Sequence, residues 1–189
     1  MGASTILVHL HRVVVLLFAL AVGVAPETFA QRFDRAQVEA AYLLSFMRYT
    51  EWPPGALPPP EAPIVVVVYR SSATAEALET IAASGELVAG REIEVRRART
   101  AERLARQLAG AHVLYVGAAA DATDALARTE ALVLTIGAGP EFARQGGMLA
   151  LVPLGNRIVF DANLAAIRVS GLKISAKVLA LARRVEGGP

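Results

Sequence analysis

The 189-residue sequence contains no cysteine, only two lysines and three histidines. The absence of cysteine excludes disulfide bonds, thiol catalysis and thiolate metal sites. Because Lys173 and Lys177 are the two lysines, nearly all of the positive charge comes from arginine. The formal net charge of +2 at pH 7 is far from the strong basic excess that is typical of nucleic-acid-binding proteins.

Catalytic motifs are also missing. Beyond residue 30 the chain has one histidine, His112, which lies in an apolar segment and is interpreted as a core or strand-end residue. The sequence has no G-x-S-x-G motif, no H-E-x-x-H motif and no phosphate-binding loop. Gly137-Ala138-Gly139 lacks the third glycine of a dinucleotide fingerprint. We therefore expect neither an enzyme nor a bound cofactor or metal.

The first 30 residues resemble a signal peptide. An uncharged apolar run at 13–24 follows Arg12, and small residues occupy Thr28 and Ala30. Twelve residues are too few to cross a bilayer as a helix, which needs about twenty. We predict cleavage after Ala30 and a periplasmic protein that begins at Gln31. An uncleaved amphipathic anchor is the alternative, because the leader carries little positive charge.

Residues 31–189 are expected to form a single α/β domain. The apolar runs at Ile64–Tyr69, 112–116 and 132–136 predict strands that are buried on both faces, and helix-forming segments lie between them. The alternating polarity of 92–96 predicts a strand near a sheet edge. This order predicts a three-layer sandwich, with a mostly parallel sheet and helices on both faces.

The C-terminal part departs from this alternation. Two apolar segments flank Leu154-Gly155-Asn156 and predict an antiparallel hairpin. A helix is predicted over 164–185, with a kink at Gly171 and with Asn163 as its N-cap. On this helix Ile174, Val178, Leu181 and Val185 would form an apolar stripe, and Lys173, Lys177 and Arg184 would share another face.

A helix is also predicted over 34–50, where Asp34 is well placed to cap it. Residues 40–47 are apolar on almost every side, so this helix is expected to be buried on more than one side or to pack on a second molecule, such as another copy of the chain. Trp52 stands between the helix and a proline-rich segment. It is expected either to fill the core or to anchor an interface.

Four motifs, taken together, resemble the YfiR family of periplasmic regulators. They are AAYLLSFMRYTEWP at 40–53, FARQGGM at 142–148, FDANL at 160–164 and LKISAKVLALA at 172–182. Their order and spacing carry the resemblance, which extends over nearly all of the chain beyond residue 30. Within these motifs, structural roles are expected for Phe46, Gly146, Gly147, Phe160 and Asn163.

The resemblance implies a function that composition does not show. It implies a negative regulator that binds the periplasmic part of an inner-membrane diguanylate cyclase, and so lowers cyclic di-GMP and biofilm formation. The sequence departs from the family where cysteines often occur, near Val67 and at Ala111. Disulfide-linked control therefore has no cysteines to act through in this chain.

Two hypotheses of function follow. In the first, the chain binds a membrane-bound cyclase or sensor kinase. The residues expected to contact this partner are Tyr49, Glu51, Trp52, Arg168, Lys173 and Lys177. In the second, the chain binds a small molecule in the crevice at the carboxyl ends of the strands, where Gly117, Gly137 and Gly139 would let a ligand approach the backbone. No nucleic acid and no membrane-spanning segment is expected in either case.

Overall fold

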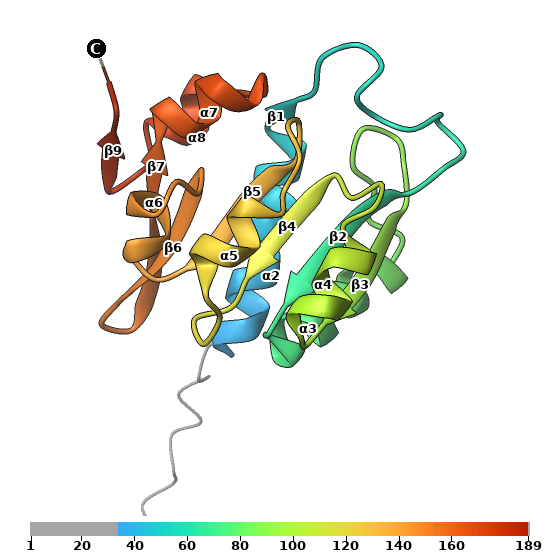
Figure 1. Cartoon of the computed structure of the whole chain (residues 1–189), viewed down its shortest axis with the longest axis horizontal. Helices are drawn as coiled ribbons and strands as arrows, with labels where there is room; N and C mark the ends of the chain where they lie inside the picture. Colours follow the sequence, from blue (N-terminus) through green and yellow to red (C-terminus); the bar gives the residue numbers. More distant parts are fainter. Residues whose placement is uncertain (1–33, 189) are drawn as a thin grey trace, which may run out of the picture. The chain divides into compact units, whose positions relative to one another are not determined.

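A computed structural model describes residues 34–188. These residues form a seven-stranded sheet in the order β3-β2-β4-β5-β6-β7-β9, together with a two-stranded sheet of β1 and β8 (Figure 1). The strands are β1 (Thr50–Glu51), β2 (Ile64–Tyr69), β3 (Ile93–Ala98), β4 (Val113–Val116), β5 (Leu134–Ala138), β6 (Leu149–Leu154), β7 (Arg157–Asn163), β8 (Lys173–Ile174) and β9 (Arg184–Glu186).

The large sheet is mostly parallel, as the sequence predicts. Strands β2 to β6 pair in parallel, β6 and β7 form the expected antiparallel hairpin, and β9 pairs in parallel with β7. β3 lies at one edge of the sheet, in agreement with its alternating polarity. The helices are α2 (Arg35–Arg48), α3 (Ser72–Ala83), α4 (Ala101–Gln107), α5 (Ala122–Ala127), α6 (Glu141–Arg144), α7 (Leu164–Ser170) and α8 (Ala176–Leu179).

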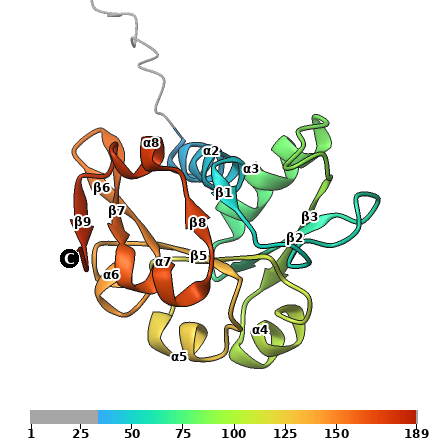
Figure 2. The same ribbon diagram turned by 90° about the horizontal axis from the view of Figure 1, so that it is seen from above.

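Helices cover both faces of the large sheet, which confirms the three-layer arrangement. Figure 2 shows α2 and α3 on one side of the sheet and α4 and α5 on the other. Successive residues of β2 point to opposite faces, because side chains alternate along a strand. Val66 therefore packs in the core beneath α2 and α3, whereas Val67 packs in the core beneath α4 and α5. This double burial explains the continuous β-branched run.

Helix α2 begins as expected, with the Asp34 carboxylate accepting a hydrogen bond from the Ala36 N–H. Its inner side, which includes Leu43 and Phe46, is fully buried against the sheet. Other apolar positions on its flanks are half-buried, and within 40–47 the exposed positions are Ala41 and Ser45. The apolar character of this helix therefore serves contacts with both the sheet and α3.

The prediction of one helix over 164–185 is wrong. Helix α7 ends at Ser170, because Gly171 adopts a left-handed conformation with φ of +79°. The chain then forms β8, the short helix α8 and the edge strand β9. The expected apolar stripe does not form, since Val178 is buried while Leu181 is 76% exposed. Pairing of β8 with β1 replaces the helical pattern with a long-range contact.

Candidate functional site

The small sheet of β1 and β8 joins two of the sequence segments in which partner-binding residues were predicted. Thr50 lies opposite Ile174, and Glu51 lies opposite Lys173. The pairing continues beyond the strands, because the Ser175 N–H donates to the Tyr49 carbonyl over 2.9 Å. Residues more than 120 positions apart in the chain thus form one surface.

Local sequence explains why β1 follows α2 so closely. The Thr50 hydroxyl donates to the Phe46 carbonyl over 2.7 Å and so satisfies one of the last carbonyls of the helix. The proline after Trp52 disfavours further helix. The chain therefore leaves α2 in an extended conformation, which allows it to pair with β8.

We define the β1–β8 surface as Tyr49, Glu51, Lys173 and Lys177. All four residues are exposed, with Tyr49 at 51%. Lys177 is placed by the first turn of α8, where the Ser175 hydroxyl accepts from its backbone N–H. The surface therefore combines an aromatic ring, one carboxylate and two ammonium groups.

Trp52 lies behind this surface rather than fully on it. The indole is half-buried against the core, and its Nε1 donates to the Leu132 carbonyl over 3.2 Å. The Leu132 N–H in turn donates to the Ser170 carbonyl. Trp52 thus connects the end of β1 to the start of β5 and the end of α7, a position from which it can support the exposed residues.

Arg168 and Arg184 make their contacts elsewhere. The guanidinium of Arg168 donates to the carbonyls of Leu164 and Gly187, and so contacts the C-terminal tail. Arg184 lies on β9 and pairs with Glu186. The helical face that Lys173, Lys177 and Arg184 were expected to share does not form, because these residues lie on β8, α8 and β9 rather than on one helix.

The aromatic residues of the predicted structural motifs meet in the core. Phe46 on α2 contacts Phe160 on β7 edge to face, with ring centroids 5.0 Å apart. Tyr42 packs against both rings and donates its hydroxyl to the Ile158 carbonyl over 2.9 Å. This cluster attaches α2 to the C-terminal hairpin and gives Phe46 and Phe160, both buried, the structural roles that were expected.

The glycine pair after α6 has two separate roles. Gly146 has φ of +101°, which a residue with a side chain rarely adopts. Gly147 lies against the ring of Phe142, and a Cβ atom added there would be 2.0 Å from that ring. A Cβ added at Gly137 would be 2.2 Å from the same ring. Phe142 therefore fills the space that was expected to admit a ligand at Gly137, and that expectation is wrong.

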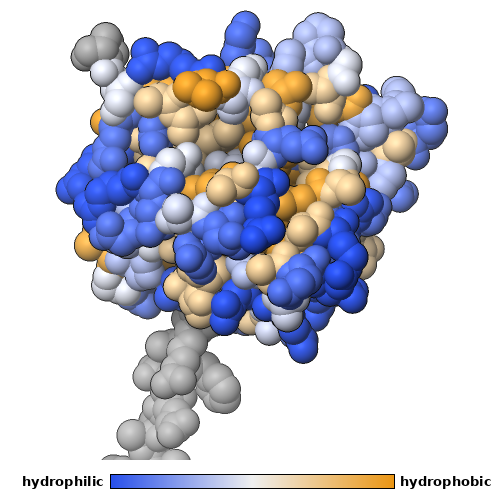
Figure 3. Space-filling model, in the orientation of Figure 1, coloured by the Kyte–Doolittle hydropathy of each residue, from blue (hydrophilic) through white to orange (hydrophobic). Residues whose placement is uncertain are grey.

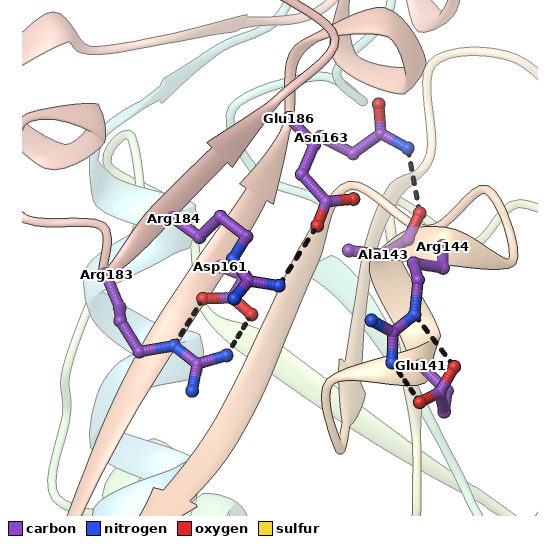
Figure 4. A network of polar contacts seen from close by, with 8 residues as sticks. All are labelled: Glu141, Ala143, Arg144, Asp161, Asn163, Arg183, Arg184 and Glu186. Carbon is purple, nitrogen blue, oxygen red and sulfur yellow. Dashed lines mark hydrogen bonds and ion pairs between the residues drawn. The ribbon is translucent and has the colours of Figure 1, made fainter.

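Asn163 caps α7, as predicted. Its side-chain oxygen accepts from the Ala166 N–H over 3.0 Å. Its Nδ2 donates to the Ala143 carbonyl over 2.8 Å, as Figure 4 shows. One amide therefore joins β7, α7 and α6. Both contacts are made at this position of the motif. Asparagine can make them because its side-chain amide offers both an acceptor and a donor.

Comparison with family models shows to which family this chain belongs. The model of the DUF4154 family, described as YfiR/HmsC-like, matches residues 36–183. The chain belongs to the YfiR/HmsC-like family. The match covers all four sequence motifs, including those that build the β1–β8 surface. No curated protein matches the sequence significantly.

Solved structures resemble this YfiR-like protein in fold. One is a conserved domain protein from Vibrio cholerae O1 biovar El Tor strain N16961, with a TM-score of 0.52 and 16% identity over 80% of this chain. Another is described as the ABC domain in complex with L-Trp from Streptococcus pneumonia, with a TM-score of 0.52 and 13% identity over 77% of this chain. The alignments cover 60% of each of those chains. At this identity the likeness shows the α/β fold alone.

Two buried polar groups of the YfiR-like protein escaped the sequence analysis. Asp161 is 2% exposed and accepts two hydrogen bonds from Arg183, at 2.8 and 2.5 Å (Figure 4). Hydrogen bonding to Asp161 raises the pKa of Arg183, against the opposing effect of desolvation. The pair holds the tail at β7, where the Arg183 N–H also donates to the Phe160 carbonyl.

Glu39 is the second of these groups, at 4% exposure on the inner side of α2. Its carboxylate accepts from the Thr74 hydroxyl and the Tyr115 hydroxyl, both over 2.7 Å, and from Arg35 over 2.8 Å. Burial raises the pKa of Tyr115, and the nearby carboxylate adds to this effect, so the phenol remains a donor. Helical spacing from Ala36 to Leu43 was a usable signal, because it places position 39 on the buried side.

His112 has the structural role that the sequence predicts. Its Nδ1 accepts from the Val65 N–H over 3.0 Å, and burial lowers the pKa of the imidazole, with smaller contributions from Arg96 and Arg91. Within residues 34–188 no group of three or more His, Cys, Asp or Glu side chains is arranged to hold a metal ion. In the same range, no helix has the length and apolar character that a membrane span requires.

Two of the three glycines named at the carboxyl ends of the parallel strands are closed to a ligand, whereas nothing lies within 4 Å of the Cβ position at Gly139. The position of a Cβ at Gly117 is blocked by the Arg70 carbonyl at 2.5 Å, so this glycine is also closed to a ligand. A hollow of about 230 Å³ lies nearby, between the ends of β2 and β3. Arg97, which lines it, is already paired with Glu79 and Glu76. The hollow is smaller than most small-molecule sites, which measure roughly 300–1,000 Å³.

Proposed function

We propose that this YfiR-like protein is exported to the periplasm and acts there as a negative regulator of an inner-membrane signalling protein. The first candidate partner is a diguanylate cyclase, which would place the protein in the control of cyclic di-GMP and biofilm formation. A sensor kinase with a periplasmic domain is the second candidate. Membership of the YfiR/HmsC-like family supports a regulatory role rather than an enzymatic one.

One observation supports assigning the proposed function to specific residues. The pairing of β1 with β8 unites exposed residues from two of the family motifs in a single surface. These motifs lie far apart in the chain, and the residues that meet here are exposed. Their exposure favours a role in binding over a role in core packing. The alternative function, small-molecule binding at the carboxyl ends of the strands, has less support, because Phe142 and the Arg70 carbonyl occupy the space beside Gly137 and Gly117 and leave only Gly139 open among its three glycines.

Charge reversal on this surface tests the proposal. The variant Lys173→Glu with Lys177→Glu should recover much less partner from solubilised inner membrane than wild type, with an unchanged melting temperature. In cells the same variant should fail to lower cyclic di-GMP. Arg103→Glu with Arg106→Glu is the matched control, since these exposed arginines lie on α4, on the other side of the sheet. Equal recovery by both double variants would contradict the assignment of this surface.

A further inference from the structure

Positive charge on the β1–β8 surface lacks a partner within the described chain. Neither Lys173 nor Lys177 forms an ion pair or a side-chain hydrogen bond with residues 34–188, although Glu51 lies opposite Lys173 in the β1–β8 pairing. Two arginines in neighbouring segments are neutralised, since Arg48 pairs with Glu86 and Arg183 pairs with Asp161. The two ammonium groups are thus available to bind anionic groups from another molecule.

Exposed apolar side chains also occur at Tyr49 and in the C-terminal segment that contains the two lysines. Six large apolar side chains are exposed in residues 34–188, and four of them belong to Tyr49 or to the C-terminal segment from α7 to β9. These four are Tyr49 at 51%, Val169 at 87%, Leu181 at 76% and Val185 at 44%. Figure 3 shows hydrophobic atoms beside hydrophilic ones at the end of the molecule where Figure 1 places α7 and β1. Apolar anchors next to charges are typical of protein interfaces.

We infer that the β1–β8 surface binds an acidic segment of the membrane partner, whose carboxylates pair with Lys173 and Lys177 while an apolar side chain packs against Tyr49. This inference rests on the proposed function. Lysine suits such a contact, because its flexible ammonium group pairs with carboxylates without a fixed planar geometry. A lipid surface fits less well, since stable attraction to anionic lipid typically requires a cluster of about four to eight basic residues.

The scarcity of lysine makes this contact directly testable. A carbodiimide activates carboxylates and joins them to amines in contact, with no spacer. The mature protein offers the amines of Lys173 and Lys177 and that of its N-terminus. We therefore expect carbodiimide treatment of the mature protein with inner-membrane vesicles to yield cross-linked peptides that join Lys173 or Lys177 to an Asp or Glu of a membrane protein.

Two variants separate charge from reactivity. Lys173→Arg with Lys177→Arg keeps the positive charge but removes the reactive amines, so the partner should still be retained while the cross-link disappears. The double change to Glu should reduce retention by about tenfold or more, as the loss of two charge pairs predicts. Retention that is undiminished in the Glu variant, or cross-links that involve only carboxylates of this chain, would overturn the inference.

The remaining outcomes distinguish this inference from the proposed function. If the protein instead sediments with protein-free vesicles that contain phosphatidylglycerol, and the Glu variant does not, the surface binds lipid and the acidic-segment inference is wrong. If neither cross-linking nor affinity capture retains any membrane protein, the proposed function itself fails. A partner that is retained through other residues overturns the inference alone.

Discussion

Replacement of Gly147 by alanine should destabilise the protein through one identifiable contact. The added methyl group would be 2.0–2.5 Å from the ring of Phe142, well inside the separation that carbon atoms tolerate. The Phe142 ring has little room to move away, because it is 2% exposed and also lies against Gly137. Gly147 is not among the glycines with positive φ, so backbone strain does not contribute to the effect.

The size of this effect follows from overpacking in a closed core. Insertion of an extra carbon into a well-packed site costs about 1–3 kcal/mol. With the ring confined from both sides, we expect the upper half of that range, about 2–3 kcal/mol. A domain of this size loses roughly 2–4 °C in melting temperature for each kcal/mol. The Gly147→Ala variant should therefore melt about 5–10 °C below wild type.

Thermal and urea denaturation of wild type and four variants would test this reasoning. Gly188→Ala is the matched control, because nothing lies within 4 Å of its added Cβ, and its stability should change by less than about 0.5 kcal/mol. Phe142→Leu should relieve the clash, so Gly147→Ala should cost at least about 1 kcal/mol less in that background. Additive effects in the double variant, or a Gly147→Ala variant as stable as wild type, would refute the proposed contact.

Three further predictions concern pH, helix capping and export. The pKa of His112 is lowered in the folded protein, whereas in the unfolded chain it is about 6.5. Below that pH the unfolded chain therefore binds more protons than the folded protein. The free energy of unfolding should fall as the pH is lowered through this value. Urea titrations at several pH values should show a smaller fall for His112→Gln. Asn163→Ala should cost about 1–2 kcal/mol in thermal denaturation, whereas Asn163→Asp, which keeps the capping oxygen, should cost less. Mass spectrometry of the periplasmic protein should find Gln31, which lies outside the described residues, as the first residue. Full-length chain in the cytosol would contradict export.

Much of the fold follows from local sequence. The β-branched run of β2 predicted a central strand, because only a strand buried on both faces suits such a composition. Asp34 and Asn163 were recognised as helix caps, since capping depends on a side chain and the backbone within three residues. The antiparallel hairpin of β6 and β7 was likewise predicted from its turn residues.

The C-terminal segment shows where local reasoning failed. The apolar spacing of 174–185 is typical of a helix, yet Ile174 lies in a strand and Leu181 is exposed. The competing structure depends on Gly171, whose left-handed conformation ends α7, and on β1, which lies more than 120 residues earlier in the chain. The gain from that long-range pairing cannot be read from a window of neighbouring residues.

The candidate site divides in the same way. The sequence by itself determined that the chain has two lysines, no thiol and no recognised catalytic motif, because these are properties of composition and of short motifs. It also identified Tyr49, Glu51, Lys173 and Lys177 one by one as residues that could meet a partner. Only the tertiary structure decided that β1 and β8 pair and so bring Glu51 opposite Lys173, that Trp52 is half-buried, and that Glu39 and Asp161 are buried with their partners. Each of these relationships joins residues far apart in the chain, and packing and backbone pairing in the folded state bring them together.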